Sequence, residues 1–163
     1  MCNVDGGTKG TARMNAIETI VRGVCIRGGR VLLCRSRKGG RISYLPGGHI
    51  EFGETARAAL ARETAEELGI EARVGRFLGC SEHGFMQKGE RHAEINLVFR
   101  MALHGVPSDR DPPAREDWIR FFWHPVDRLD EAGVEPSPLC RALALWLKRP
   151  GFVTSGATDR AIR

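Results

Sequence analysis

A glycine-rich turn that runs directly into an acidic helix constrains this chain more than any other stretch. Gly47 and Gly48 can adopt backbone torsions closed to other residues and can approach a ligand closely. In the helix predicted after them, Glu63, Glu66 and Glu67 fall within an arc of about 100°. Three carboxylates therefore share one helix face, where they repel one another unless a cation lies between them.

This arrangement predicts a divalent-metal site. Hard carboxylate oxygens in a near-octahedral array are the ligands that Mg²⁺ or Mn²⁺ selects. The opposite arc of the helix carries Ala58, Ala61, Ala65 and Leu68, which we expect to face a sheet. The alternative is a solvated acidic stripe without a ligand, at a cost of about a few tenths of a kcal/mol for each like-charged pair.

The rest of the chain reads as short strands and turns. Strand patterns cover residues 18–26, 31–35, 72–81, 93–103 and 118–123, and helical patterns cover 55–68 and 139–147. The polar, glycine-containing segments 36–43 and 82–91 are expected to be loops. This order lacks the regular alternation of a doubly wound fold, so it favours an α/β architecture with a mixed sheet between helices.

Length and composition indicate one soluble domain. A chain of 163 residues, 42% hydrophobic and 28% charged, is long enough for one core and short for two. We expect a domain at residues 16–149 between flexible tails at 1–15 and 150–163. No apolar run reaches the ~18 residues of a membrane span, and the first residues carry no apolar signal region, so we expect a cytoplasmic protein that does not bind membranes.

Net charge and cysteine content limit the kinds of partner and of metal or disulfide site that we expect. The net charge of +5 comes from scattered basic residues, so we do not expect nucleic acid as a partner, whereas a small polyphosphate would be attracted. The five cysteines are odd in number and contain no CxxC pair, which argues against a disulfide framework and a structural zinc site. No GxxxxGK[ST] or GxGxxG motif competes with the acidic helix for the role of phosphate site.

The turn and helix together resemble the signature box of the Nudix hydrolases. The fixed positions are Gly48, Glu54 after five residues, Arg62-Glu63 after seven more, then Glu66-Glu67, Gly69 and the aliphatic Ile70. Every fixed position matches. The resemblance implies a Nudix-type α/β/α sandwich with a mixed β-sheet between helices. It also implies hydrolysis, with Mg²⁺ or Mn²⁺, of a phosphoanhydride bond in a nucleoside diphosphate linked to another moiety, which includes nucleoside triphosphates.

The resemblance also assigns roles to residues. The metal ligands would be the carbonyl of Gly47 and the carboxylates of Glu63, Glu66 and Glu67. The candidates for the catalytic base are Glu66, Glu67 and Glu94, the last from the start of a downstream strand; Glu82 and His83 are weaker candidates. Positioning roles fall to Gly48, Glu54, Arg62 and Gly69, with Glu54 and Arg62 as a salt bridge.

The substrate stays open at this stage. Phe85, Met86, Gln87 and Lys88 occupy the positions where ADP-ribose and diadenosine-polyphosphate enzymes carry their marks, and they match neither. A nucleotide-sanitising activity or a nucleoside-diphosphate-sugar activity remains. The competing class is a Nudix module that binds a nucleotide or RNA without cleaving it, but all the box carboxylates are retained, which favours an enzyme. A homodimer is an expectation by family analogy alone.

Overall fold

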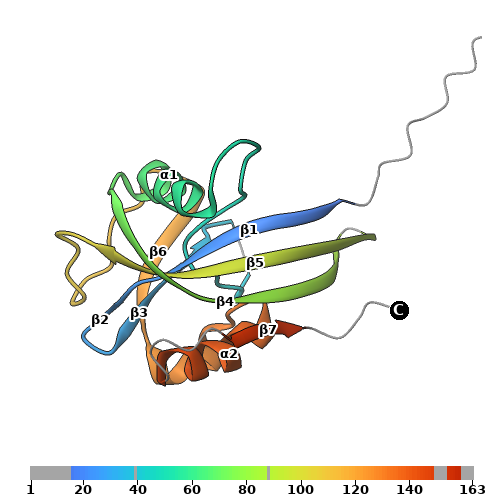
Figure 1. The fold of residues 1–163 in the computed structure, drawn as a ribbon. Helices are drawn as coiled ribbons and strands as arrows, with labels where there is room; N and C mark the ends of the chain where they lie inside the picture. Colours follow the sequence, from blue (N-terminus) through green and yellow to red (C-terminus); the bar gives the residue numbers. More distant parts are fainter. Residues whose placement is uncertain (1–15, 39, 88, 149–153, 159–163) are drawn as a thin grey trace, which may run out of the picture.

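The computed structural model describes residues 16–38, 40–87, 89–148 and 154–158. The elements in chain order are β1 (Ile17–Val24), β2 (Ile26–Arg27), β3 (Arg30–Ser36), α1 (Ala56–Leu68), β4 (Ala72–Gln87), β5 (Glu90–Leu103), β6 (Ile119–Pro125), the 3₁₀ segment η1 (Val126–Ala132), α2 (Ser137–Lys148) and β7 (Thr154–Thr158) (Figure 1). No helix in the described part of the chain is both long and apolar enough to cross a membrane.

The strands are divided between two sheets. The first has the order β1-β5-β4-β7, with β1 parallel to β5, β5 antiparallel to β4 and β4 parallel to β7, so it is mixed. The second, β2-β3-β6, is antiparallel. The sequence predicted one strand over residues 18–26, but the chain passes from one sheet to the other at Cys25, between β1 and β2. The expected α/β class with a mixed sheet between helices is confirmed.

The hairpin between β2 and β3 turns at two glycines. Gly28 and Gly29 have φ values of 56° and 71°, and a two-residue hairpin turn with positive φ at both positions is the type that matches strand twist. Arg27 therefore pairs with Arg30 at the end of the ladder.

Two hydrophobic cores lie on opposite sides of the strands. Along β3, Leu32 belongs to the core under α1, and its neighbour Leu33 belongs to the core under α2, as expected when successive side chains point to opposite faces. Leu60 of α1 and Trp146 of α2 are the buried anchors of the two layers, each contributing roughly 1.5–3 kcal/mol through burial. Figure 1 shows α1 and α2 on either side of the strands.

The expectation of a polar loop at residues 82–91 is wrong. β4 continues to Gln87 and β5 begins at Glu90, so the segment is the end of a long antiparallel hairpin whose turn contains Gly89 at φ 83°. Phe85 pairs with His92 across the two strands, and their rings stack with centroids 5.1 Å apart. The polar side chains fit a strand here because the hairpin runs past α1, where less of its surface is covered (Figure 1).

The ends of the chain differ from expectation in one respect. The predicted N-terminal tail at residues 1–15 lies outside the described residues. Within the segment 150–163, where we expected a flexible tail, Thr154–Thr158 forms β7 and adds a parallel strand to β4. The other residues of that segment lie outside the described part of the chain.

Candidate functional site

The Gly47–Gly48 turn is held against β1 by the backbone. The Pro46 carbonyl accepts a hydrogen bond from Gly23 at 2.7 Å, and the Gly48 carbonyl accepts one from Val21 at 2.9 Å. Gly47 lies between them at φ 137°, and a β-carbon there would lie 2.0 Å from the Val21 carbonyl oxygen. Only glycine fits this position.

Gly48 is needed for a different reason. A β-carbon on Gly48 would lie 2.4 Å from the carboxyl carbon of Glu63 and 2.5 Å from its Oε1. The Glu63 carboxylate therefore lies directly against the backbone of the turn. The turn and the acidic helix meet at this contact.

The helix α1 is defined at both ends by caps. The Thr55 hydroxyl oxygen accepts a hydrogen bond from the Ala58 amide at 3.2 Å, which satisfies one of the free N–H groups of the first turn. Gly69 ends the helix in the left-handed conformation, at φ 68°, and its N–H bonds to the Ala65 carbonyl. These caps fix the length of the helix and hence the rotation of its carboxylates.

The buried face of α1 is not the one that the alanines indicated. Ala58 is exposed, Ala61 and Ala65 are half-buried, and only Leu68 of the expected set is buried. The side chain of Glu67 is instead buried with the core, at 6% exposure. Because the helix is rotated away from the expected orientation, one carboxylate of the acidic set points into the protein.

Arg62 is the shared counter-ion of the site. It donates to both oxygens of Glu54, from Nη2 at 2.8 Å and from Nε at 3.3 Å. Its Nη1 donates to Glu63 at 3.0 Å and to Glu66 at 3.1 Å, and its Nη2 also donates to the His49 carbonyl at 3.1 Å. These charge-assisted bonds raise the pKa of Arg62, and the bond to Arg62 lowers the pKa of Glu54.

Glu67 carries the strongest electrostatic perturbation among the carboxylates of the site. The pKa of Glu67 is raised to about 7, mainly by burial and secondly by the neighbouring Glu63 carboxylate, while the positive charge of Arg22 opposes both. One oxygen, Oε2, is buried and has no hydrogen-bond partner among the described residues. A buried carboxylate oxygen without a partner is costly, and a cation would satisfy it.

The donor set fits a hard divalent cation, although the metal-free arrangement is not a finished metal site. Within residues 16–38, 40–87, 89–148 and 154–158, no three His, Cys, Asp or Glu side chains are already gathered as ligands. Glu63 and Glu66 each give an oxygen to Arg62 instead. The orphaned oxygen of Glu67 and the position of Glu63 against the glycine turn supply oxygen donors of the kind that Mg²⁺ and Mn²⁺ prefer.

A cleft of about 530 Å³ contains Glu94. Glu94 is 8% exposed, and its Oε1 accepts a hydrogen bond from Asn96 at 3.1 Å. Asn96 in turn accepts a bond from Arg22 at 3.2 Å. Asn96 and Arg22 connect Glu94 to the carboxylates of α1, because Arg22 bonds to Asn96 and its charge acts on Glu67.

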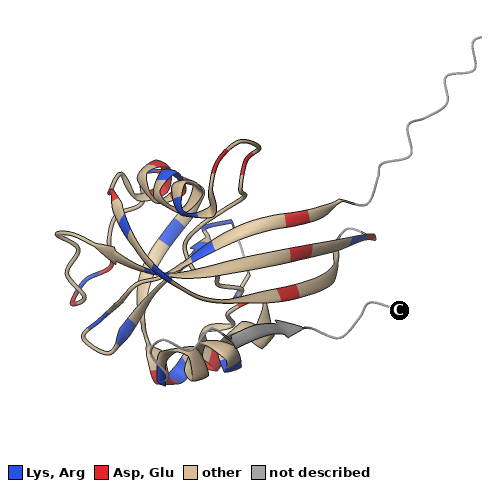
Figure 2. Ribbon diagram, in the orientation of Figure 1, with Lys and Arg blue, Asp and Glu red and all other residues tan. Residues whose placement is uncertain are grey.

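The wall of the cleft is aromatic and acidic. Tyr44, His83 and Phe85 line it, and the rings of His83 and Phe85 stack at 5.1 Å. Glu18 lies opposite Glu94 in the β1–β5 register, and Figure 2 shows acidic positions side by side on β1, β5 and β4.

Sequence reasoning missed Arg22 and Asn96. Both lie within the first sheet, and Asn96 is fully buried. Arg22 interrupts the apolar run of β1, and a charged residue inside such a run is the signal that could have marked it. Of the weaker base candidates, His83 lines the cleft, whereas Glu82 is exposed.

Comparisons with known proteins agree with this geometry. The chain is 34% identical over 132 residues to the "Putative mutator protein MutT4" of Mycobacterium tuberculosis, an alignment that covers 74% of this chain and 52% of that protein. It is 46% identical over 57 residues to the "Putative 8-oxo-dGTP diphosphatase 2" of the same species, covering 33% of this chain and 40% of that protein. The chain thus spans about half, or less, of the length of these relatives.

A solved structure and a family match extend the likeness to most of the chain. The solution structure of the E. coli ORF135 protein superimposes with a TM-score of 0.64 at 26% identity, covering 88% of this chain and 100% of that chain. Residues 18–143 match the NUDIX domain. The chain therefore belongs to the Nudix family of hydrolases.

Proposed function

We propose that this chain hydrolyses a phosphoanhydride bond of a nucleoside diphosphate derivative with Mg²⁺ or Mn²⁺, and that nucleoside triphosphates are its main substrate class. The observation that carries the proposal is the buried, unpartnered oxygen of Glu67 next to the Glu63 carboxylate and the glycine turn. A fold that buries a carboxylate in this way gains when a cation binds it. The name of one mycobacterial relative, a putative 8-oxo-dGTP diphosphatase, favours triphosphates over diphosphate sugars.

Four groups would hold the metal: the Gly47 carbonyl and the carboxylates of Glu63, Glu66 and Glu67. The carbonyls of Pro46 and Gly48 on either side are bonded to β1, whereas that of Gly47 accepts no backbone hydrogen bond from the described residues. A bound cation supplies neutralisation of the phosphate oxygens and a water of lowered pKa for in-line attack.

The other steps belong to residues of the chain. Glu94 is the base that the cleft supports best, because Asn96 orients its carboxylate and Arg62 does not compete for it; Glu66 and Glu67 remain the alternatives within the metal shell. Arg22 lies between the cleft and Glu67 and would bind a phosphate oxygen of the substrate. The stacked rings of His83 and Phe85 form part of the cleft wall, and a nucleobase would pack against this row of rings.

The proposal is tested by assaying a panel of substrates with Mg²⁺ and with Mn²⁺. Formation of the nucleoside mono- and diphosphate products would be measured from the common nucleoside triphosphates, 8-oxo-dGTP, ADP-ribose and a nucleoside-diphosphate sugar. We expect turnover of at least one triphosphate and its loss in Glu67→Gln. The matched control is Glu71→Gln, which makes the same change at an exposed position just beyond α1 and should leave the rate unchanged.

Two results would overturn the proposal. One is a wild-type protein that is inert on every compound with both metals. The other is a Glu67→Gln variant as active as the wild type.

A further inference from the structure

A second pocket, of about 350 Å³, lies where the two sheets meet. It is lined by residues from the β1–β2 junction, the start of β4 and the end of β5, and it shares no lining residue with the catalytic cleft. Nothing in the proposed hydrolysis uses it.

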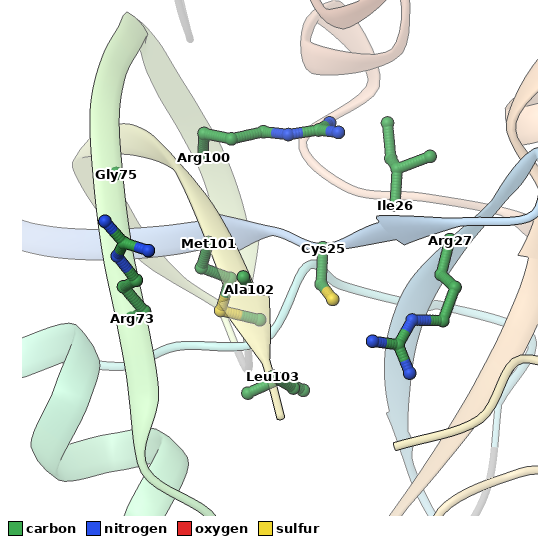
Figure 3. Close-up of a pocket in the computed structure, with 9 residues that line it drawn as sticks. All are labelled: Cys25, Ile26, Arg27, Arg73, Gly75, Arg100, Met101, Ala102 and Leu103. Atoms are coloured by element: carbon green, nitrogen blue, oxygen red, sulfur yellow. The ribbon is translucent and has the colours of Figure 1, made fainter. Parts of the chain in front are cut away.

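Three arginines surround this pocket. Arg27, Arg73 and Arg100 line it, and none of its lining residues is an Asp or a Glu. Figure 3 shows Arg73 and Arg27 on either side of Cys25, with Arg100 along a third edge. The three guanidinium groups come from different strands and lie at separate edges of the pocket (Figure 3).

Arg100 is the group that most needs a ligand. Its side chain is half-buried, and its Nη1 is buried without a hydrogen-bond partner among the described residues. Burial lowers the pKa of Arg100, and the nearby charge of Arg76 lowers it as well. A partly buried guanidinium is stabilised by an anionic partner, and no Asp or Glu in the lining supplies one.

The other two arginines have exposed side chains that can move to contact an anion. Arg73 is exposed and free of any described ion pair, and Arg27 is exposed while one of its nitrogens donates to the Val106 carbonyl. The guanidinium fork matches the oxygens of a phosphate group and can bind two at once. Buried Cys25 and Met101 form an apolar floor beneath them.

The geometry points to a second anion site in this pocket, which binds a phosphate or diphosphate group through Arg73, Arg100 and Arg27 without a divalent cation. Without a metal, the carboxylates of α1 would repel a phosphate. Phosphate binding in the absence of metal would therefore distinguish this site from the hydrolytic centre.

Titration of the full chain with inorganic pyrophosphate in EDTA tests this inference. We expect saturable calorimetric binding with a Kd of about 1 mM or tighter. Arg73→Gln and Arg100→Gln should each weaken it about tenfold or more. The matched control is Arg76→Gln, the same change at an exposed position of β4 outside the lining; because the charge of Arg76 reaches Arg100 only through the general field, it should weaken binding by no more than about threefold.

A second measurement locates the ligand. Amide chemical shifts should change at Cys25, Gly75 and Ala102, which line the pocket, and not at Gly48 or Glu63. The inference is overturned by an absence of saturable binding, by shifts confined to the glycine turn, or by equal weakening in Arg73→Gln and Arg76→Gln, which would mean a diffuse positive field. If Arg100→Gln does not fold, the exposed Arg73 decides the question.

Discussion

Replacing Glu67 by Gln should stabilise the metal-free protein while removing its activity. Between pH 4.5 and about 7 the folded protein retains a proton on Glu67 that the unfolded chain has already released, because burial raises the pKa from 4.5 to about 7. Wild-type stability therefore falls as the pH rises through this window. The Gln variant has no such proton to lose.

The size of the expected change in the free energy of unfolding follows from the pKa shift of Glu67. Each pKa unit corresponds to about 1.4 kcal/mol, so the full shift corresponds to about 3 kcal/mol. The side chain is 6% exposed, so solvent screening removes little of it. Urea unfolding in EDTA should show that Glu67→Gln gains about 2–3 kcal/mol more over the wild type at pH 8 than at pH 5.

The same experiment contains its control and its refutation. Glu71→Gln removes a carboxylate from an exposed position and should show no such dependence on pH. Adding Mg²⁺ at pH 8 should raise the unfolding midpoint of the wild type more than that of Glu67→Gln, since ligand binding stabilises the folded state. If the difference between Glu67→Gln and the wild type is the same at both pH values, Glu67 is not a strained carboxylate and the argument for a cation at this place fails.

Other substitutions separate folding from catalysis. Gly47→Ala should lower the free energy of unfolding by about 3 kcal/mol, because the new carbon meets backbone at a positive φ; urea unfolding measures this. Gly48→Ala meets only the movable carboxylate of Glu63, so it should fold normally and lose about 100-fold in kcat/KM. Arg62→Gln releases the carboxylates that it bridges and should lose about 10- to 100-fold in kcat/KM; unchanged kinetics would exclude a positioning role. Gly79→Ala places a carbon 2.3 Å from an indole ring of α2 and should cost about 1–3 kcal/mol, whereas full stability would show that α2 can shift.

The rotation of α1 shows where sequence reasoning reaches its limit. The spacing of Glu63, Glu66 and Glu67 predicted one acidic helix face, and the structure keeps them adjacent. An apolar-face argument then assigned Ala58 and Ala65 to the sheet, because it assumes that charged residues stay in water. Glu67 breaks this assumption, because it is a carboxylate buried with the core; under the proposed function a bound cation would offset its cost.

Contacts between residues far apart in the chain could not be predicted from the sequence either. The register of β1 against β5 brings Arg22 next to Asn96, and no local pattern specifies a pairing between residues so far apart. The hairpin end at residues 82–91 was mistaken for a loop because polarity and glycines indicate loops only on average. The turn at Gly28 and Gly29 was predictable because positive φ at both positions is a local property.

Arg62 balances the negative charges of Glu63 and Glu66 in a way that would let a cation take its place beside them. Arg62 gives Glu63 and Glu66 one hydrogen bond each, and charge-assisted bonds contribute about 1.5–3 kcal/mol. Because Glu54 bonds to two nitrogens of the same guanidinium, Arg62 stays anchored when those carboxylates turn to a metal. Glu67 has no such partner for its Oε2 among the described residues, so its burial cost of about 3 kcal/mol would be relieved by a proton at low pH or, under the proposed function, by a cation. Arg62 therefore limits the repulsion among the carboxylates, while under the proposed function the relief of the burial cost of Glu67 would favour cation binding.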